Sequence, residues 1–182
     1  LRNFSRHDES ALKAVDIHTG IDSTLMILQN RLKPKPDYPE IQVNKKYGKL
    51  PFIECYPGQI NQVFMNIIAN AIDALETQNA PRTISIFTSV RCPETGDDIA
   101  ETWPGIPLAV IRISDNGPGI PEHVRRRIFE PFFTTKPIGK GTGLGLSISY
   151  SIVVDKHQGN MQCISTPSQG TEFIIEIPIR QS

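Results

Sequence analysis

The stretch GKGTGLGLSIS, residues Gly139–Ser149, places four glycines at alternate positions and then turns apolar. Glycine loses much entropy on folding, so it is kept where the backbone needs an unusual conformation or where something approaches it closely. A glycine-rich loop that leads into a helix also leaves unpaired N–H groups and the positive end of the helix dipole facing outward. The stretch therefore predicts an anion site, and phosphate is the obvious anion.

Two familiar phosphate-binding motifs do not fit this loop. A P-loop needs Ser or Thr after its Gly-Lys pair, but Leu50 follows Gly48-Lys49 and Gly141 follows Gly139-Lys140. The dinucleotide fingerprint G-x-G-x-x-G fails because residues 144 and 146 are leucines. The H-R-D and D-F-G signatures of protein kinases are absent from the sequence. The loop has to be interpreted with the rest of the chain.

The composition is that of one ordinary soluble domain. The chain has 182 residues, of which 38% are apolar and 21% charged, and its net charge is zero, which gives no electrostatic reason to expect nucleic acid as a partner. No run approaches the ~18 apolar residues of a transmembrane helix, and the polar start lacks a signal peptide, so a cytoplasmic location is expected. The chain opens on Leu1 instead of Met, which suggests a fragment of a longer protein. That longer protein could carry a membrane anchor. Three scattered cysteines indicate reduced thiols.

Apolar periodicity predicts helices and strands in an irregular order. The most regular pattern lies in residues 57–76, where one broad apolar stripe follows a helical repeat. Residues 82–90 and 108–115 alternate as half-buried strands. Because helices and strands do not alternate strictly, we expect an α+β fold built as a two-layer α/β sandwich. Further helices are expected at 15–33, 121–128 and 143–157, further strands at 160–166 and 171–179, and a hairpin from 41–48 and 51–56.

The helix expected at 57–76 carries a polar stripe opposite its apolar one. A solvated face explains its two glutamines, but Asn is a poor helix former, and Asn66 and Asn70 together cost about 1 kcal/mol relative to alanine. Their carbonyl oxygens are neutral, hard ligands that suit Mg²⁺. From this pattern alone, the two Asn residues are equally compatible with a solvent-exposed surface and with a functional site. The stripe consists of Gln59, Gln62, Asn66, Asn70 and Asp73.

Two shorter stretches add candidates. In SDNGPGI, residues 114–120, Asp115 follows a strand and precedes two glycines. An ionised carboxylate accepts from N–H groups and could hold the exocyclic amine of a purine, although an ordinary Asx turn explains the same letters. In RIFEPFFTTK, residues 127–136, three phenylalanines are apolar anchors, and at least two of them are expected in the core.

Taken in order, the Asn-bearing helix, D-x-G-x-G, F-x-P-F-F, G-x-G-x-G-L-G-L and the Gly-Thr pair at 170–171 resemble the five boxes of the GHKL ATP-binding superfamily. The layout is most similar to the catalytic ATP-binding domain of bacterial-type sensor histidine kinases. The resemblance implies the Bergerat fold, a mixed sheet of about five strands with three main helices, and binding of ATP and Mg²⁺. Residues 1–13 would be the end of a dimerisation helix and linker, and residues 14–182 the catalytic domain.

The resemblance also implies roles for individual residues. Asn70 corresponds to the Mg²⁺ ligand, and Asn66 to a second polar residue beside the phosphates, part of the catalytic machinery. Asp115 would bind the adenine amine, with Gly117, Gly119 and Ile120 shaping the base pocket and Thr171 nearby, acting through water. Asp73 stands where many relatives carry Lys, so no direct phosphate contact is expected of it. The phosphate side would comprise Lys136, Lys140, Gly141, Thr142, Gly143, Leu144, Gly145 and Leu146, the first four within a mobile lid spanning 131–142.

Residue 66 separates kinase from ATPase. Gyrase-like and chaperone-like relatives place a water-activating Glu there, whereas Asn66 cannot act as a base, which favours transfer of the γ-phosphate to a protein nucleophile. In the resembling kinases that nucleophile is a His on a dimerisation hairpin, and the phosphoryl group then passes to an Asp of a response regulator.

His7 lies too close to Asn66 to be that acceptor, so the chain would be a monomeric catalytic fragment that does not label itself. The remaining histidines, 18, 123 and 157, are expected at the surface. A GHKL-type ATPase and a degenerate module used only for nucleotide or protein contacts are the alternatives.

Overall fold

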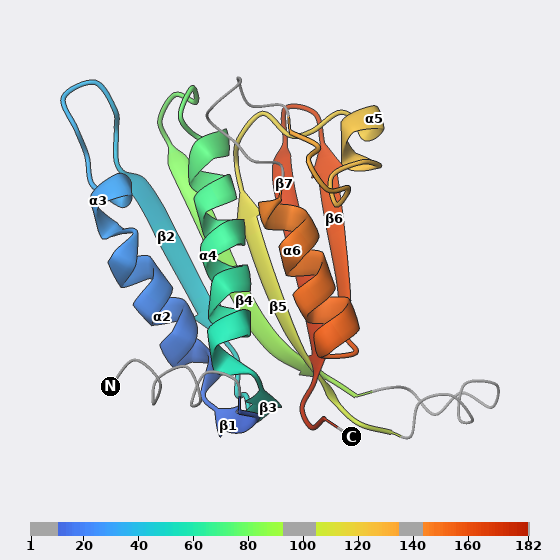
Figure 1. The fold of residues 1–182 in the computed structure, drawn as a ribbon. Helices are drawn as coiled ribbons and strands as arrows, with labels where there is room; N and C mark the ends of the chain where they lie inside the picture. The colour runs from blue at the N-terminus through green and yellow to red at the C-terminus, as the bar shows by residue number, and fades with distance from the viewer. Residues whose placement is uncertain (1–10, 93–104, 135–143, 182) are drawn as a thin grey trace, which may run out of the picture.

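A computed structural model of the chain describes residues 11–92, 105–134 and 144–181. It contains a five-stranded sheet in the order β2-β4-β5-β7-β6, with β2 parallel to β4 and the other pairs antiparallel. Helices α2, α4 and α6 lie side by side on one face of this sheet (Figure 1). The expected two-layer α/β sandwich with a mixed sheet is therefore confirmed. The strands are β2 Ile41–Tyr47, β4 Arg82–Arg91, β5 Leu108–Asp115, β6 Asn160–Thr166 and β7 Gly170–Pro178.

The central helix α4, Pro57–Ala74, is the helix predicted from the 57–76 pattern. Pro57 stands in its first turn, where the missing N–H costs nothing. Its apolar stripe packs against strand residues that are equally buried, among them Ile84, Ile111 and Ile113. Burial of such a side chain is worth about 1.5–3 kcal/mol, so the orientation of α4 about its own axis is strongly set. The stripe consists of Ile60, Val63, Phe64, Ile67, Ile68, Ala71 and Ile72.

The N-terminal part differs from the single helix expected at 15–33. Strand β1, Lys13–Val15, comes first, and α2 then runs from Ile17 to Ile27, followed by the short α3, Gln29–Leu32. Asp16 ends the strand and begins the helix, because its side chain accepts a hydrogen bond from the His18 backbone N–H at 2.9 Å. This side-chain cap sets the start of the helix at Ile17, two residues after the expected start at residue 15.

The hairpin expected between residues 41–48 and 51–56 is wrong. Strand β2 pairs in parallel with β4, and β3, Ile53–Cys55, pairs with β1 in a separate two-stranded sheet. Gly48 is not a hairpin turn: its N–H bonds the Thr88 carbonyl, and a Cβ at residue 48 would lie only 2.5 Å from that oxygen. Here glycine allows the close approach of two backbones.

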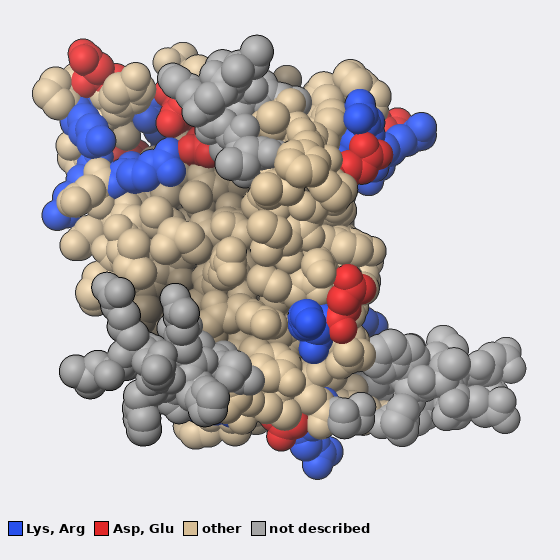
Figure 2. Space-filling view, in the orientation of Figure 1, with Lys and Arg blue, Asp and Glu red and all other residues tan. Residues whose placement is uncertain are grey.

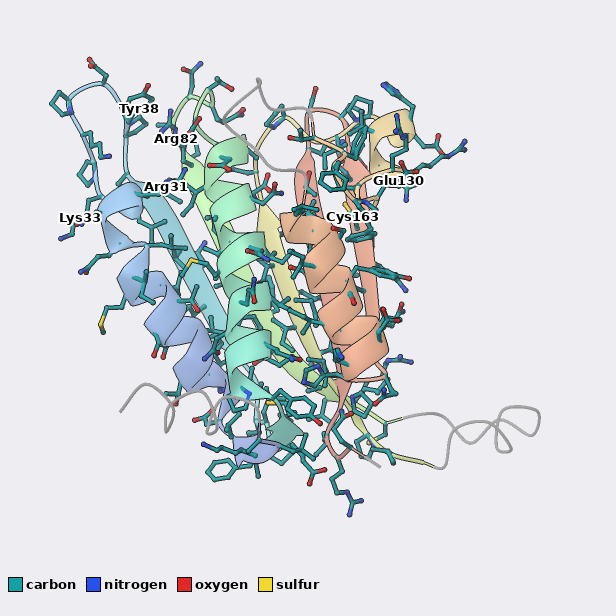
Figure 3. The ribbon with its side chains drawn as sticks, in the orientation of Figure 1. Arg31, Lys33, Tyr38, Arg82, Glu130 and Cys163 are labelled. Atoms are coloured by element: carbon teal, nitrogen blue, oxygen red, sulfur yellow. The ribbon has the colours of Figure 1, made fainter. Side chains whose placement is uncertain are left out.

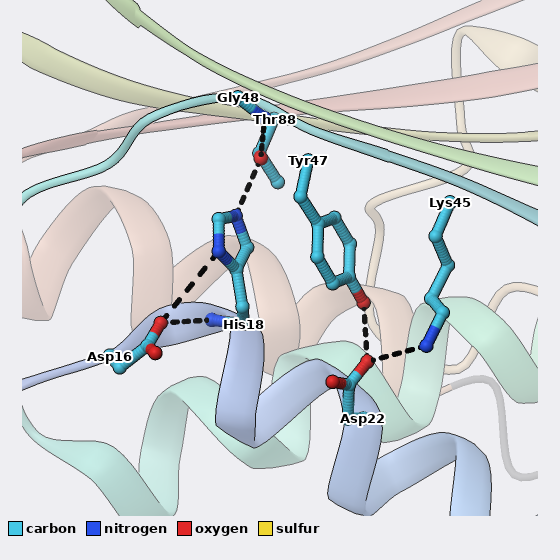
Figure 4. A network of polar contacts seen from close by, with 7 residues as sticks. All are labelled: Asp16, His18, Asp22, Lys45, Tyr47, Gly48 and Thr88. Carbon is cyan, nitrogen blue, oxygen red and sulfur yellow. Dashed lines mark hydrogen bonds and ion pairs between the residues drawn. The ribbon is translucent and has the colours of Figure 1, made fainter.

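Helix α2 is tied to the sheet by a polar network (Figure 4). The His18 ring stacks on Tyr47 at 4.1 Å between centroids, and its Nε2 lies 2.6 Å from Thr88 Oγ1. Asp22 accepts from the Tyr47 hydroxyl at 2.7 Å and from Lys45 Nζ at 3.1 Å. His18 is therefore a half-buried link between α2 and strands β2 and β4, not the surface residue that was expected.

The C-terminal helix begins with α6, Gly145–Ser151, and continues as a π-helical turn, η1, Ile152–Lys156. The short helix α5, Glu122–Arg125, lies within the stretch predicted as 121–128. Cys55 and Cys163 are free and buried and Cys92 is free and exposed, which confirms the expectation of unpaired thiols. Within the described ranges, no helix combines the length and apolar character needed to cross a membrane.

His157 is fully buried, which overturns its expected place at the surface, whereas His123 is exposed as expected. The His157 Nε2 accepts from the Tyr56 backbone N–H at 3.0 Å, and Nδ1 lies 2.8 Å from the Ile152 carbonyl, to which it must donate. The π-helical turn places the ring inward, where it joins the end of η1 to the start of α4. Because both nitrogens are committed, the ring is held neutral.

Burial lowers the pKa of His157, and the hydrogen bond to Ile152 opposes that shift only in part. Above about pH 6.5 neither the folded nor the unfolded state holds this proton; below it the unfolded state takes up the proton first, so stability falls as the pH drops. We predict that His157→Gln lowers the free energy of unfolding at pH 7.5 by about 1–3 kcal/mol and flattens its pH dependence between pH 7 and pH 5. Urea unfolding followed by circular dichroism measures both.

The matched control is His123→Gln, which changes an exposed histidine on α5 and should leave the free energy of unfolding and its pH dependence unchanged. Parallel pH profiles for the parent chain and His157→Gln would contradict the assignment of the acid sensitivity to His157.

Candidate functional site

The predicted site residues gather where β5 ends, β7 begins, and α6 starts beside α4. Asp115, the last residue of β5, pairs in register with Thr171 at the start of β7. Asn66 of α4 bonds Gly145 at the start of α6. A Cβ placed at Gly117, in the loop after β5, would lie 3.1 Å from the Ala74 carbonyl at the end of α4. One corner of the sandwich thus brings four separate stretches of the sequence together.

Asp115 is buried, with 8% of its surface exposed. Its Oδ1 accepts from the Gly117 backbone N–H at 2.9 Å, and the Thr171 backbone N–H also bonds the carboxylate. Burial raises the pKa of Asp115, and these two backbone hydrogen bonds counter the rise in part. The side chain is therefore a firmly held hydrogen-bond acceptor in a low-dielectric setting, beneath the loop that follows β5.

Two glycines allow close packing around Asp115, one against its carboxylate and one against its backbone carbonyl. A Cβ at Gly117 would lie 2.9 Å from Asp115 Oδ1, and a Cβ at Gly170 would lie 2.0 Å from the Asp115 carbonyl oxygen. Gly170 also has a φ of +97°, which side chains rarely adopt. Gly117 and Gly170 are thus both required by close packing around Asp115.

Ser165 is a site residue that the sequence analysis missed. Its Oγ accepts from the Ile120 backbone N–H at 2.7 Å and donates to the Gly170 carbonyl at 3.0 Å, while Thr171 Oγ1 lies 3.0 Å away. It therefore joins the loop after β5 to the start of β7. One sequence feature could have identified it: Ser165 is a small polar residue at an inward-facing position of β6, where the other inward-facing residues are Met161 and Cys163.

Asn66 links the two helices that border the site. Its Nδ2 donates to the Gly145 carbonyl at 3.0 Å and to Ser149 Oγ at 3.1 Å. Asn70 lies one turn further along the same face of α4 and is half-buried. The structure thus places Asn66 beside the start of α6, with Asn70 one turn further along α4, and Leu146 packs partly against the core.

Asp73, the last residue of the predicted stripe, pairs with a residue of α3. Arg31 Nη2 lies 2.5 Å from Asp73 Oδ1 and 3.4 Å from Glu76 Oε1. In Figure 3, Arg31 lies towards the end of the helical layer where α4 finishes. The expectation that Asp73 makes no phosphate contact stays a prediction, and this ion pair is a described alternative role for it.

The phenylalanine stretch contributes less to the core than expected. Phe129 packs against Tyr150 and Phe173, with ring centroids 5.0 Å and 6.3 Å away. Phe133 is half-buried beneath the Arg127 guanidinium, and Phe132 is 74% exposed. The expectation of at least two core rings is wrong, because the turn that carries residues 131–134 lies at the surface.

Several predicted residues lie outside the described parts of the chain. They are the phosphate-side residues Lys136, Lys140, Gly141, Thr142 and Gly143. Leu144 is described as the N-cap of α6. Figure 2 shows few charged side chains over the middle of the helical face, and the charged groups gather towards its ends.

The described residues offer a distinct set of chemical groups. A buried carboxylate can accept from an aromatic amine, and two Asn side chains carry neutral oxygens one helical turn apart. No cluster of three or more His, Cys, Asp or Glu side chains that could hold a metal occurs among the residues that the structure describes. The face of α4 that borders α6 carries amides and no carboxylate at residue 66 or 70. This arrangement suits binding of a base and of phosphate-bound Mg²⁺ better than activation of water.

Comparison with known proteins finds a family match that includes the residues of this candidate site. Residues 56–181 match the family described as "Histidine kinase-, DNA gyrase B-, and HSP90-like ATPase". Sporulation kinase E of Bacillus subtilis is 36% identical over 133 residues, which are 73% of this chain and 15% of that protein. Sensor kinase CckA of Brucella abortus is 35% identical over 179 residues, 96% of this chain and 18% of that protein. The chain thus spans less than a fifth of the length of either relative.

A solved structure shares the fold. The catalytic domain of histidine kinase ThkA is 25% identical, with a TM-score of 0.68 over 93% of this chain and 98% of that one. ThkA has also been solved in complex with the response regulator protein TrrA. Since the family match covers more than two thirds of the chain, the chain belongs to the family of histidine kinase-, DNA gyrase B- and HSP90-like ATPases.

Proposed function

We propose that this chain is the ATP-binding catalytic domain of a sensor histidine kinase. It transfers the γ-phosphate of ATP to a His on a dimerisation hairpin outside this chain, and the phosphoryl group then passes to an Asp of a response regulator. Residues 14–182 form the catalytic domain, and residues 1–13 connect it to the hairpin. The observation that carries the proposal is the buried Asp115 carboxylate, held by two backbone N–H groups beside the Asn-bearing face of α4.

The Asp115 end of the site suits an adenine base. A buried carboxylate with two fixed donors keeps acceptor capacity for a third N–H group, and the exocyclic amine of adenine supplies one. Ile120 is a partly buried apolar residue of the loop that follows Asp115, and its backbone N–H donates to Ser165 Oγ, so its side chain would offer an apolar surface for the flat base. Thr171 lies at the same edge, with its hydroxyl bonded to Ser165.

The Asn end of the site suits the triphosphate and its metal. Mg²⁺ usually takes one or two protein oxygens and completes its shell with water and phosphate oxygens, which fits an amide pair better than a full cage. Asn70 would be the direct ligand, and Mg²⁺ would neutralise charge on the β- and γ-phosphates. The backbone N–H groups at the start of α6, with Gly145 and Leu146, would face the phosphates.

The site lacks a base for water at the position where an ATPase would need one. Asn66 occupies it, and its Nδ2 protons are committed to Gly145 and Ser149. An amide cannot take a proton from water at neutral pH, so the γ-phosphate is kept for a nucleophile that arrives from another part of the protein. Catalysis then consists of positioning and charge neutralisation, to which Lys136 and Lys140 of the predicted lid contribute.

Asp115→Asn should reduce ATP affinity by at least about tenfold, or about 1.4 kcal/mol, at constant Mg²⁺. Gly117 and Thr171 both donate to residue 115, and an amide has only one oxygen, so its NH₂ group must face either a backbone donor or the adenine amine. Titration calorimetry measures the affinity, and circular dichroism checks the fold. Glu172→Gln on the neighbouring strand is the matched control and should bind normally. Unchanged affinity in folded Asp115→Asn would contradict the base site.

Asn70→Ala should remove most of the gain in ATP affinity that Mg²⁺ provides, because the metal loses its proposed protein ligand. The measurement compares ATP affinity in Mg²⁺ with that in EDTA for the parent chain and the variant. Gln62→Ala, two turns earlier on the same polar stripe, is exposed and should behave as the parent chain does. The metal assignment fails if Asn70→Ala keeps the full effect of Mg²⁺.

Incubated alone with γ-labelled ATP, the chain should stay unlabelled, whereas a longer protein that includes the upstream hairpin should become labelled on His. Labelling of the chain alone that disappears in His7→Ala would overturn the assignment of the acceptor to the hairpin. Steady release of inorganic phosphate by the chain alone would favour an ATPase instead.

A further inference from the structure

Ser149 lies in α6, one turn beyond Gly145, and is fully buried, with 0% of its surface exposed. Its hydroxyl donates to the Gly145 carbonyl at 2.8 Å and lies 3.1 Å from Asn66 Nδ2. Asn66 Nδ2 also donates to the same Gly145 carbonyl, at 3.0 Å. These three groups form a small closed triangle at the junction of α4 and α6.

The triangle determines which end of the Asn66 amide points toward α6. The only proton of the Ser149 hydroxyl goes to the Gly145 carbonyl, so the Ser149 oxygen presents a lone pair to Asn66. A rotated amide would place its oxygen 3.0 Å from the Gly145 carbonyl oxygen and beside a hydroxyl with no proton left to donate. Only the NH₂ group of Asn66 satisfies both neighbours, and both of its protons are used.

The oxygen of the same amide is then free for another partner. An amide is planar and carries its oxygen and nitrogen on opposite sides, so Oδ1 is turned away from the Ser149 and Gly145 contacts. Among the described residues, Asn66 Oδ1 has no hydrogen-bond partner, and it is not one of the buried atoms left unsatisfied. The three atoms nearest to a Cβ added at Gly145 all belong to Asn66, at 3.7 to 3.9 Å, so Asn66 lies directly against the start of α6.

We propose that Ser149 is a positioning residue: its hydroxyl fixes the Asn66 amide so that Oδ1 faces the triphosphate and its Mg²⁺ together with Asn70. This inference rests on the proposed nucleotide site and adds to it a residue in the apolar continuation of the glycine-rich stretch. Ser149 touches neither nucleotide nor metal and acts through Asn66. Without the Ser149 hydroxyl, the Asn66 NH₂ group loses one of its two acceptors. The amide can then rotate, so that for part of the time NH₂ instead of Oδ1 faces the proposed Mg²⁺ position.

A purely structural role makes a different prediction. A Ser hydroxyl that bonds the carbonyl four residues earlier is a common local feature of helices, and its loss would change stability. It would weaken nucleotide binding equally with and without the metal. The ratio of ATP affinities in Mg²⁺ and in EDTA therefore separates the two roles, because an amide that loses its orientation affects the metal-dependent part alone.

The test measures that ratio by titration calorimetry for the parent chain, Ser149→Ala, Asn66→Ala and the double variant. Ser149→Ala should reduce the Mg²⁺-dependent gain by about three- to tenfold while ATP affinity in EDTA stays within about twofold of the parent value. In the Asn66→Ala background the same Ser149 change should have no further effect on the gain, because its partner is gone. Ser151→Ala, which removes a hydroxyl that bonds Asp155 on the same helix, is the matched control and should leave the gain unchanged.

An unchanged gain in folded Ser149→Ala, or an equal loss with and without metal, would overturn the positioning role. If Ser149→Ala does not fold, Ser149→Cys keeps the size and a weaker donor and should show a smaller loss of the same kind. A parent chain that shows no Mg²⁺-dependent ATP binding at all would instead contradict the proposed function, so the two failures are distinguishable.

Discussion

The packing of α4 on the sheet is the constraint from which the site follows. Its apolar stripe is buried over the whole length of the helix, from Ile60 to Ile72. A rotation of α4 that moved Asn66 or Asn70 away from α6 would expose this stripe and drive amides into the core, where an unpaired polar group costs about 1–3 kcal/mol. The same hydrophobic burial that stabilises the sandwich therefore also keeps the two amides on the side of α4 that faces the candidate site.

The two ends of the site use different physical devices. At the proposed base end, a carboxylate is buried at a cost, and the backbone N–H groups of Gly117 and Thr171 offset only part of that cost. At the proposed phosphate end, the groups are neutral, and the orientation of Asn66 is set by its hydrogen bonds with Gly145 and Ser149. The sheet joins the two ends, since β5 delivers Asp115 while its neighbour β7 begins at Gly170 and Thr171.

Much of the fold could be predicted from local patterns, and the failures have physical causes. In helix α4 and strands β4 and β5, one face is more deeply buried than the other, so the apolar periodicity of the sequence predicts them. The pairing of β2 was missed because a parallel partner lies beyond a helix, and nothing local in residues 41–48 distinguishes it from a hairpin. His157 was misplaced because a π-helical turn shifts the helical phase, and no pattern of apolar residues marks such a turn.

The sequence predicted which stretches come together at the candidate site, but not the contacts that support them. The order of the Asn, Asp and Gly-rich stretches indicated which residues belong together, but roles for them came from the resemblance to a family and not from spacing. Ser149 and Ser165 are single small polar residues within apolar patterns, and only the three-dimensional arrangement shows that they bond Asn66 and the Asp115 loop. Residues 135–143, with both predicted lid lysines, lie outside the described structure, so the lid stays a prediction from the sequence.

The central claim is that Asp115 recognises an adenine base through an acceptor held by Gly117 and Thr171. The most direct measurement follows the backbone amide signals of these two residues by nuclear magnetic resonance during titration with ATP and, separately, with GTP. The account predicts that both signals shift with ATP, because the 6-amino group of adenine donates to the same carboxylate, and shift far less with GTP, which has a carbonyl oxygen at that position. Binding of ATP that leaves both signals in place while signals elsewhere move would contradict it.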